Sequence, residues 1–272
     1  FSINSFKCWV CDARSKNIYR LVRKFGSYQQ RQKYLELQGR LDLTEFEDIF
    51  REINEEETIQ KIDLPLEFIS LCNRHLPLHS KAPMEYLKSR GLNKNEVLKW
   101  KIGYCKEGRY AGRIVIPSIN NDGDCNYFIA RSYVGHGRRY LNPPCGRDII
   151  FNSLMVDWDE PVVLVEGVFD AIVIGDNAIP ILGSTLREDS RLFQALAIHD
   201  TPIFVALDPD AEKKAQWIIR SCLKYDLEVK KINLEDYEDI GSMSREVFLE
   251  KLKTAEDVDG DMYWLEKQLR NL

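Results

Sequence analysis

The chain contains the run Val162-Val163-Leu164-Val165-Glu166-Gly167, and a similar run, Ile203-Phe204-Val205-Ala206-Leu207-Asp208-Pro209-Asp210, follows further along. Both are short, apolar and rich in β-branched residues, which is typical of strands buried on both faces of a parallel sheet. Helical periodicity from Phe169 to Ile174 and from Arg187 to Ile198 separates them. We therefore predict an α/β fold in which both runs are strands of one Rossmann-like, mainly parallel sheet.

Both predicted strands end in carboxylates, namely Glu166 after the first and Asp208 and Asp210 after the second. The carboxyl ends of parallel strands share one edge of a sheet, and open α/β sheets bind their ligands there. Clustered carboxylates repel one another unless a cation neutralises them, and their hard oxygen atoms suit Mg²⁺ or Mn²⁺. The alternative is that Asp210 only caps a helix beginning at Ala211 and that Glu166 faces solvent at its strand end.

This Glu-Gly and Asp-x-Asp pattern resembles the toprim fold, which DnaG-type primases, topoisomerases and some nucleases share. In that family these acids hold the catalytic metal ions. Asp170 also matches a family position, and Asp239 lies in a segment that resembles the one supplying a further acid. The resemblance implies that two divalent ions, Mg²⁺ or Mn²⁺, are held by Glu166, Asp170, Asp208, Asp210 and Asp239. It makes Glu166, Asp208 and Asp210 the catalytic residues.

The net charge of −5 is unevenly distributed along the chain. Residues 1 to 150 carry 25 Lys and Arg against 18 Asp and Glu, whereas residues 151 to 272 carry 13 against 25. Between Lys101 and Ile150, tyrosines and a phenylalanine are interleaved with the basic residues. Such a segment can attract phosphates and stack bases, although an ordinary solvated face with core tyrosines would have the same composition.

The basic segment has its own resemblance to DnaG-type primases. Residues 112 to 119 and 127 to 131 read as two strands joined by a turn at Asp122-Gly123, and Arg139-Tyr140-Leu141-Asn142-Pro143 follows them. The same order precedes the toprim sheet in primases. The resemblance implies nucleotide- and DNA-binding roles for Arg113, Arg131, Arg139, Tyr140 and Asn142. Arg139 stands where cellular primases usually carry Lys, which is a departure from the family pattern.

The amino-terminal pair Cys8 and Cys11 has zinc-knuckle spacing and resembles the second half of a primase zinc ribbon. Structural zinc needs four ligands, and we read Cys72 and His75 as ordinary helix residues rather than as the second pair. We expect the first half of the ribbon to lie upstream of Phe1. Zinc is then expected in the full-length protein, and a reduced cysteine pair is the alternative for this fragment.

These features predict four segments, and helical periodicity predicts helices at Ile18 to Phe25, Tyr28 to Leu37 and Leu43 to Glu57. Residues 1–26 are the partial zinc ribbon, 27–80 a helical linker, 81–158 a basic α+β primase subdomain, and 159–272 a toprim catalytic domain that ends in short helices near Arg245 to Thr254 and Met262 to Leu269. The 44% hydrophobic content is enough for a packed core. No apolar stretch is long enough to span a bilayer, so we expect no membrane partner. Scattered cysteines favour a reducing cytoplasm, which would be that of the bacterial host if a phage encodes the chain.

The family resemblance implies a DNA primase, which joins ribonucleoside triphosphates into RNA primers on a single-stranded DNA template. The sequence has no P-loop, so we expect no fused helicase motor in it. A partner replicative helicase, and a single-strand-binding protein, are implied by the family alone. The abbreviated carboxyl end most resembles compact primases of T-even-type tailed phages. Two alternatives stay open: a toprim nuclease that uses the same acids for hydrolysis, and a toprim module that only binds DNA.

Overall fold

The computed structural model divides into two units, Phe1–Ile59 and Gln60–Leu272. It describes residues 60–258 apart from His136, Asp176, Ser184, Thr185, Asp226, Glu235, Asp236, Glu238 and Asp239. In the first unit it describes only Phe6, Lys7, Arg14, Ser15, Ile18, Leu21, Val22, Phe25, Gln30, Lys33, Tyr34 and Leu37. Among all the described residues, none of the helices has the length and apolar character that a membrane span needs.

In the first unit, strand β1 (Phe6–Lys7) pairs antiparallel with β2 (Arg14–Ser15). Leu21, Val22 and Phe25 have helical backbone, as do Gln30 to Leu37 wherever the structure describes them. These positions agree with two of the predicted helices. Cys8, Cys11 and the predicted helix at 43–57 lie outside the described residues, so the zinc ribbon stays a prediction.

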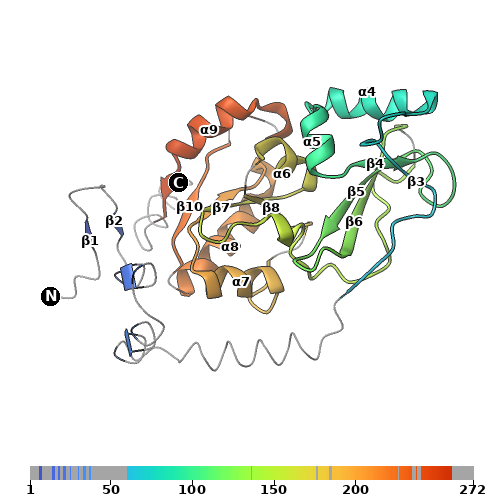
Figure 1. The fold of residues 1–272 in the computed structure, drawn as a ribbon. Helices are drawn as coiled ribbons and strands as arrows, with labels where there is room; N and C mark the ends of the chain where they lie inside the picture. Colours follow the sequence, from blue (N-terminus) through green and yellow to red (C-terminus); the bar gives the residue numbers. More distant parts are fainter. Residues whose placement is uncertain are drawn as a thin grey trace. The chain divides into compact units, whose positions relative to one another are not determined.

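The second unit contains the predicted sheet as its centre (Figure 1). Its strands run in the order β11-β10-β9-β7-β8, all parallel except the antiparallel edge strand β11. Their bounds are β7 Val162–Val165, β8 Ala178–Pro180, β9 Ile203–Ala206, β10 Val229–Lys231 and β11 Glu256–Asp257. The α/β prediction is therefore confirmed, and the two quoted runs are neighbouring parallel strands.

Helices cover both faces of this sheet, because successive side chains of a strand point to opposite sides. Val163 and Val165 of β7 pack on the side of α6 (Val168–Ile174) and α9 (Arg245–Lys253). Val162 and Leu164 pack on the side of α7 (Arg191–His199) and α8 (Glu212–Lys224). Figure 1 shows these two pairs of helices on opposite faces. Short 3-10 turns occur at η2 Ser153–Met155, η3 Pro209–Ala211 and η4 Ile240–Ser242.

A second sheet is antiparallel, with the order β3-β4-β5-β6. The strands are β3 Phe68–Ser70, β4 Gly103–Cys105, β5 Arg113–Ile119 and β6 Cys125–Ser132, and η1 (Leu78–Ser80), α4 (Lys81–Ser89) and α5 (Lys94–Lys99) join β3 to β4. The β5–β6 hairpin is the predicted one, and its turn uses Gly123 at φ +84°. One face of this sheet shares a continuous apolar core with the α6 side of the parallel sheet.

Several local predictions are wrong. Residues 60–80, assigned to a helical linker, instead contain strand β3, whose Phe68–Ser70 pairs with β4. Cys72 and His75 lie in turns and bends after β3 rather than in a helix. The three-residue strand β8 was not foreseen, because it ends in Pro180 and is too short to show a period. Pro is tolerated there because β8 is an edge strand.

Candidate active site

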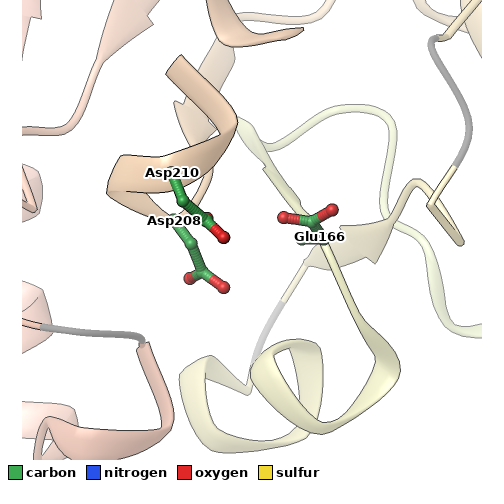
Figure 2. Close-up of side chains that lie close together, drawn as sticks. All are labelled: Glu166, Asp208 and Asp210. Carbon is green, nitrogen blue, oxygen red and sulfur yellow. The ribbon is translucent and has the colours of Figure 1, made fainter. Parts of the chain in front are cut away.

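The carboxylates at the two strand ends come together in the structure. Val165 of β7 pairs with Ala206 of β9, so the residues that follow these strands leave the sheet at the same edge. One carboxylate oxygen from each of Glu166, Asp208 and Asp210 lies within 4.8 Å of the others. Figure 2 shows Asp208 and Asp210 approaching Glu166 from the strand-to-helix turn of β9. We call these three residues the carboxylate cluster.

The turn after β9 presents both aspartates, and neither residue caps α8. Asp208 precedes the 3-10 turn η3, where Pro209 supplies a favourable first position, and it makes no capping side-chain bond. Ala211 is the N-cap of α8, also without a side-chain cap. The alternative in which Asp210 serves as the helix cap is therefore wrong, and its exposed carboxylate is directed to the cluster.

Glu166 already has a cationic partner. The ammonium of Lys214, in the first turns of α8, lies 2.7 Å from Glu166 Oε1. Both side chains are mostly buried, with 21% of Lys214 and 31% of Glu166 exposed. The alternative in which Glu166 simply faces solvent is therefore wrong as well. Three carboxylates within 4.8 Å form a hard oxygen donor set that suits a divalent cation.

Of the two remaining predicted acids, only Asp170 is described, and it is not part of the cluster. Asp170 lies in the first turn of α6, where its Oδ2 accepts a hydrogen bond of 2.9 Å from the backbone N–H of Gly167. This bond stabilises the first turn of α6, which begins directly after Glu166 and Gly167. Asp239 lies outside the described residues. A metal-binding role for either residue stays a prediction.

Arg113, predicted to bind nucleotide or DNA, is 9% exposed and acts inside the protein. Its guanidinium donates to the carbonyl oxygens of Arg138 at 2.8 Å, Ala130 at 3.3 Å and Arg139 at 3.4 Å. Burial lowers the pKa of this guanidinium from its ordinary value. Arg113 therefore fixes the loop that carries Arg138 and Arg139 to the end of β6.

Arg131 is also buried, at 7% exposure, and it connects β6 of the antiparallel sheet to helix α6. Its guanidinium donates to the hydroxyl of Tyr140 at 2.6 Å and lies over two rings, 5.3 Å from the centroid of Tyr140 and 4.9 Å from that of Phe169. Phe169 belongs to α6, close behind Glu166. Arg90 and Tyr86 contact the same ring, at 5.7 Å and 6.4 Å from its centroid.

The exposed members of the predicted set are Arg139 and Tyr140. Tyr140 is 40% exposed while its ring rests against Arg131. Asn142 is half-buried, and its Oδ1 accepts a 3.2 Å hydrogen bond from the backbone N–H of Ala130. Of the five predicted residues, two are exposed to solvent, namely Arg139 and Tyr140. The other three contact the segment from Arg138 to Tyr140 or the adjoining strand β6: Arg113, Arg131 and Asn142.

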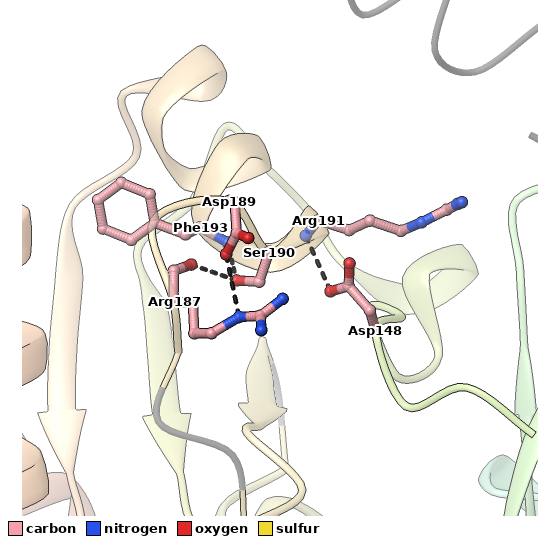
Figure 3. A network of polar contacts seen from close by, with 6 residues as sticks. All are labelled: Asp148, Arg187, Asp189, Ser190, Arg191 and Phe193. Carbon is pink, nitrogen blue, oxygen red and sulfur yellow. Dashed lines mark hydrogen bonds and ion pairs between the residues drawn. The ribbon is translucent and has the colours of Figure 1, made fainter.

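Sequence reasoning missed a second connection between the sheets, which Figure 3 shows. Asp148, which follows the antiparallel sheet, accepts a 3.0 Å hydrogen bond from the backbone N–H of Arg191 at the start of α7. Ser190 caps the same helix through Phe193 N–H at 3.4 Å. The signal that could have found the start of α7 is Ser190 itself, since Ser is a preferred N-cap residue.

Comparisons with known proteins agree with this architecture. No family model matches the chain. The sequence is 25% identical to the DNA primase of Thermotoga maritima, over a match that covers 48% of this chain and 31% of the relative. The match thus spans about a third of the relative's length.

Several solved structures are similar in fold, among them two primase structures. The zinc-binding and RNA polymerase domains of the Aquifex aeolicus primase give a TM-score of 0.58 at 18% identity, covering 94% of this chain and 74% of that chain. A DnaG primase catalytic domain bound to single-stranded DNA gives 0.56 at 18% identity, covering 66% and 74%. The fold is that of the catalytic core of DnaG-type DNA primases. In sequence, the chain is similar to the DNA primase of Thermotoga maritima over part of its length. The narrower likeness to T-even phage primases is not tested by these matches and stays a prediction.

Proposed function

We propose that this chain is the catalytic part of a DNA primase, a DNA-directed RNA polymerase that makes short primers from ribonucleoside triphosphates on a single-stranded template. The observation that carries the proposal is the carboxylate cluster at the carboxyl edge of a primase-type sheet. The name of the Thermotoga relative supports it, as does the single-stranded DNA bound by one structural neighbour.

Glu166, Asp208 and Asp210 would hold the divalent ions, which we propose to be two, Mg²⁺ or Mn²⁺. Bound there, such ions activate the primer 3′-hydroxyl and neutralise charge on the triphosphate. The chain's own contribution is to fix the acids before substrate arrives. Neighbouring strands set their spacing, and the bond from Gly167 N–H to Asp170 holds the backbone beside Glu166.

The surface formed by Arg138, Arg139 and Tyr140 would receive the template or incoming nucleotide. Arg139 offers a planar guanidinium that can bind a phosphate with two hydrogen bonds, and the exposed ring of Tyr140 can stack on a base. Arg113, Arg131 and Asn142 would position this surface from below. The family resemblance adds four expectations to this proposal. They are a zinc ribbon containing Cys8 and Cys11, a replicative helicase as partner, a single-strand-binding protein as partner, and a location in the bacterial cytoplasm.

Primer synthesis itself is the deciding test. Labelled ribonucleoside triphosphates are incubated with the chain, Mn²⁺ or Mg²⁺, and a single-stranded template, and dinucleotide products are resolved. We expect template-dependent dinucleotides. Cleavage of the template without synthesis would favour the toprim nuclease, and tight DNA binding with neither reaction would favour the binding module.

Replacing Arg139 by Ala should weaken single-strand binding. Each lost phosphate contact lowers the slope of log affinity against log salt by about one unit. The matched control is Arg187→Ala, since Arg187 is also exposed but pairs with Asp189 at 3.0 Å. Fluorescence anisotropy at several salt concentrations measures both slopes. An Arg139→Ala slope equal to that of the control would remove Arg139 from the interface.

A further inference from the structure

We propose that Lys214 is a built-in counter-ion of the carboxylate cluster, and that the first divalent ion binds by displacing its ammonium from Glu166. The inference rests on the proposed metal-binding role of the cluster. It adds a residue that is neither an acid nor part of the motif that pointed to the site. Lys214 would thereby set how tightly the metal is held.

The position of Lys214 follows from the turn after β9. Asp208 and Asp210 lie in that turn, and α8 begins at Glu212, so Lys214 stands in the first turns of the helix that leads away from the cluster. From there its Nζ reaches Glu166 Oε1 at 2.7 Å, across from β9 to the end of β7. One helix start therefore delivers the positive charge, and the turn before it delivers two of the three negative charges.

The ion pair between Lys214 and Glu166 affects metal binding through its charge. Three carboxylates within 4.8 Å repel one another, and one ammonium beside Glu166 offsets part of that repulsion when no metal is bound. A divalent ion that takes the Glu166 oxygen would stand a few Å from the ammonium, and like charges at that separation oppose each other strongly in a partly buried site. The ammonium must therefore leave for the metal to enter. Metal binding becomes an exchange of one cation for another.

The same helix provides a matched control. Lys231, the last residue of β10, pairs with Glu212 of α8 at 2.7 Å, the same length as the Lys214–Glu166 pair. Its burial is similar too, with 17% of Lys231 and 34% of Glu212 exposed. Glu212 is not a member of the carboxylate cluster. Removing either lysine thus deletes one short, partly buried ion pair of α8, but only Lys214 touches a proposed metal ligand.

The experiment is calorimetric titration of the 272-residue chain with Mn²⁺ alone. Lys214→Met keeps the apolar stem and removes the competing charge, so Mn²⁺ should bind about tenfold more tightly than to the unmodified chain. Lys214→Arg keeps the charge and should stay near the unmodified affinity. Lys231→Met should leave the affinity unchanged. In the presence of a chelator, Lys214→Met should unfold at a lower temperature than the unmodified chain. Mn²⁺ should raise this temperature again, because the ion supplies the missing positive charge. The lowered unfolding temperature of Lys231→Met should persist when Mn²⁺ is added.

Asp208→Asn separates failure of this inference from failure of the proposed metal site. If Asp208→Asn binds Mn²⁺ as the unmodified chain does, the cluster is not the metal site, and the inference falls with it. If Asp208→Asn loses Mn²⁺ binding but Lys214→Met binds no more tightly than the unmodified chain, the metal site stands and the counter-ion role is overturned. An equal gain in Lys231→Met would also overturn it, because the effect would then be a general one of net charge. Lys214→Gln repeats the test should the Met variant fold poorly.

Discussion

Asp208→Asn and Asp210→Asn should each reduce primer synthesis by orders of magnitude while leaving a folded protein that still binds single-stranded DNA. Each change removes one carboxylate charge from the cluster and keeps the shape of the side chain. Loss of a metal clamp on a transferring phosphoryl group costs about 10²-fold or more in rate. Stability should not fall, because Asp208 makes no capping side-chain bond to η3, Asp210 is not the N-cap of α8, and each change relieves repulsion among the acids. Product yield at saturating Mg²⁺, with circular dichroism of each variant, measures the effect.

Asp148→Asn is the matched control for these two variants. Asp148 accepts a hydrogen bond from Arg191 N–H, and an Asn oxygen can accept the same bond. It lies outside the carboxylate cluster, so its loss of charge should leave primer yield near that of the unmodified chain. Near-normal primer synthesis by Asp208→Asn or Asp210→Asn would contradict the proposed metal mechanism.

Phe169→Ala should lower the free energy of unfolding by about 3–5 kcal/mol, the usual cost of deleting a buried aromatic ring. The ring is almost fully buried, and it is contacted by Arg131 of β6, by Tyr86 of α4 and by Arg90 at the end of α4. Its removal therefore leaves a cavity and also deprives two guanidinium groups of the aromatic face that they cover. Denaturant unfolding followed by circular dichroism gives the difference.

Two companion variants show whether the ring itself is responsible. Phe169→Leu fills most of the volume and should recover most of the stability lost in the Ala variant. Leu154→Ala shortens a side chain that is 51% exposed and should cost little. A loss below about 1 kcal/mol for Phe169→Ala would show that the site collapses around the cavity and that the ring does not join the sheets.

The main sheet and the carboxylate cluster could be predicted from the sequence because one physical rule determines both. Apolar runs of strand length fix β7 and β9, and parallel neighbours end at one edge, so Glu166 and the two aspartates had to meet there. The β5–β6 hairpin was predictable for a similar reason, since the turn sequence Asp122-Gly123 separates two runs of strand length. These predictions needed only local pattern and chain topology.

The partners of individual side chains could not be predicted, because they depend on how elements distant in sequence pack. Lys214 contacts Glu166 because of the way in which α8 is oriented about its own axis, and the sequence does not show this orientation. Arg113 and Arg131 were predicted to bind nucleotide or DNA because the basic segment resembles that of DnaG-type primases. The structure instead buries both guanidinium groups against carbonyl oxygens or aromatic rings. The strands β3 and β8 are three residues long, too short for a period to appear.

The apolar core that runs from the antiparallel sheet to the α6 face of the parallel sheet has a consequence for how this molecule can be divided. Leu87, Trp100 and Tyr127 belong to the same buried cluster as Val163 and Phe169. Separating the chain near residue 158, where the sequence suggests a domain boundary, would therefore expose apolar surface on both fragments rather than cut a linker. The two sheets should melt as one cooperative body. A recombination event that replaced either sheet would also have to replace the apolar residues of that sheet that pack against the other one.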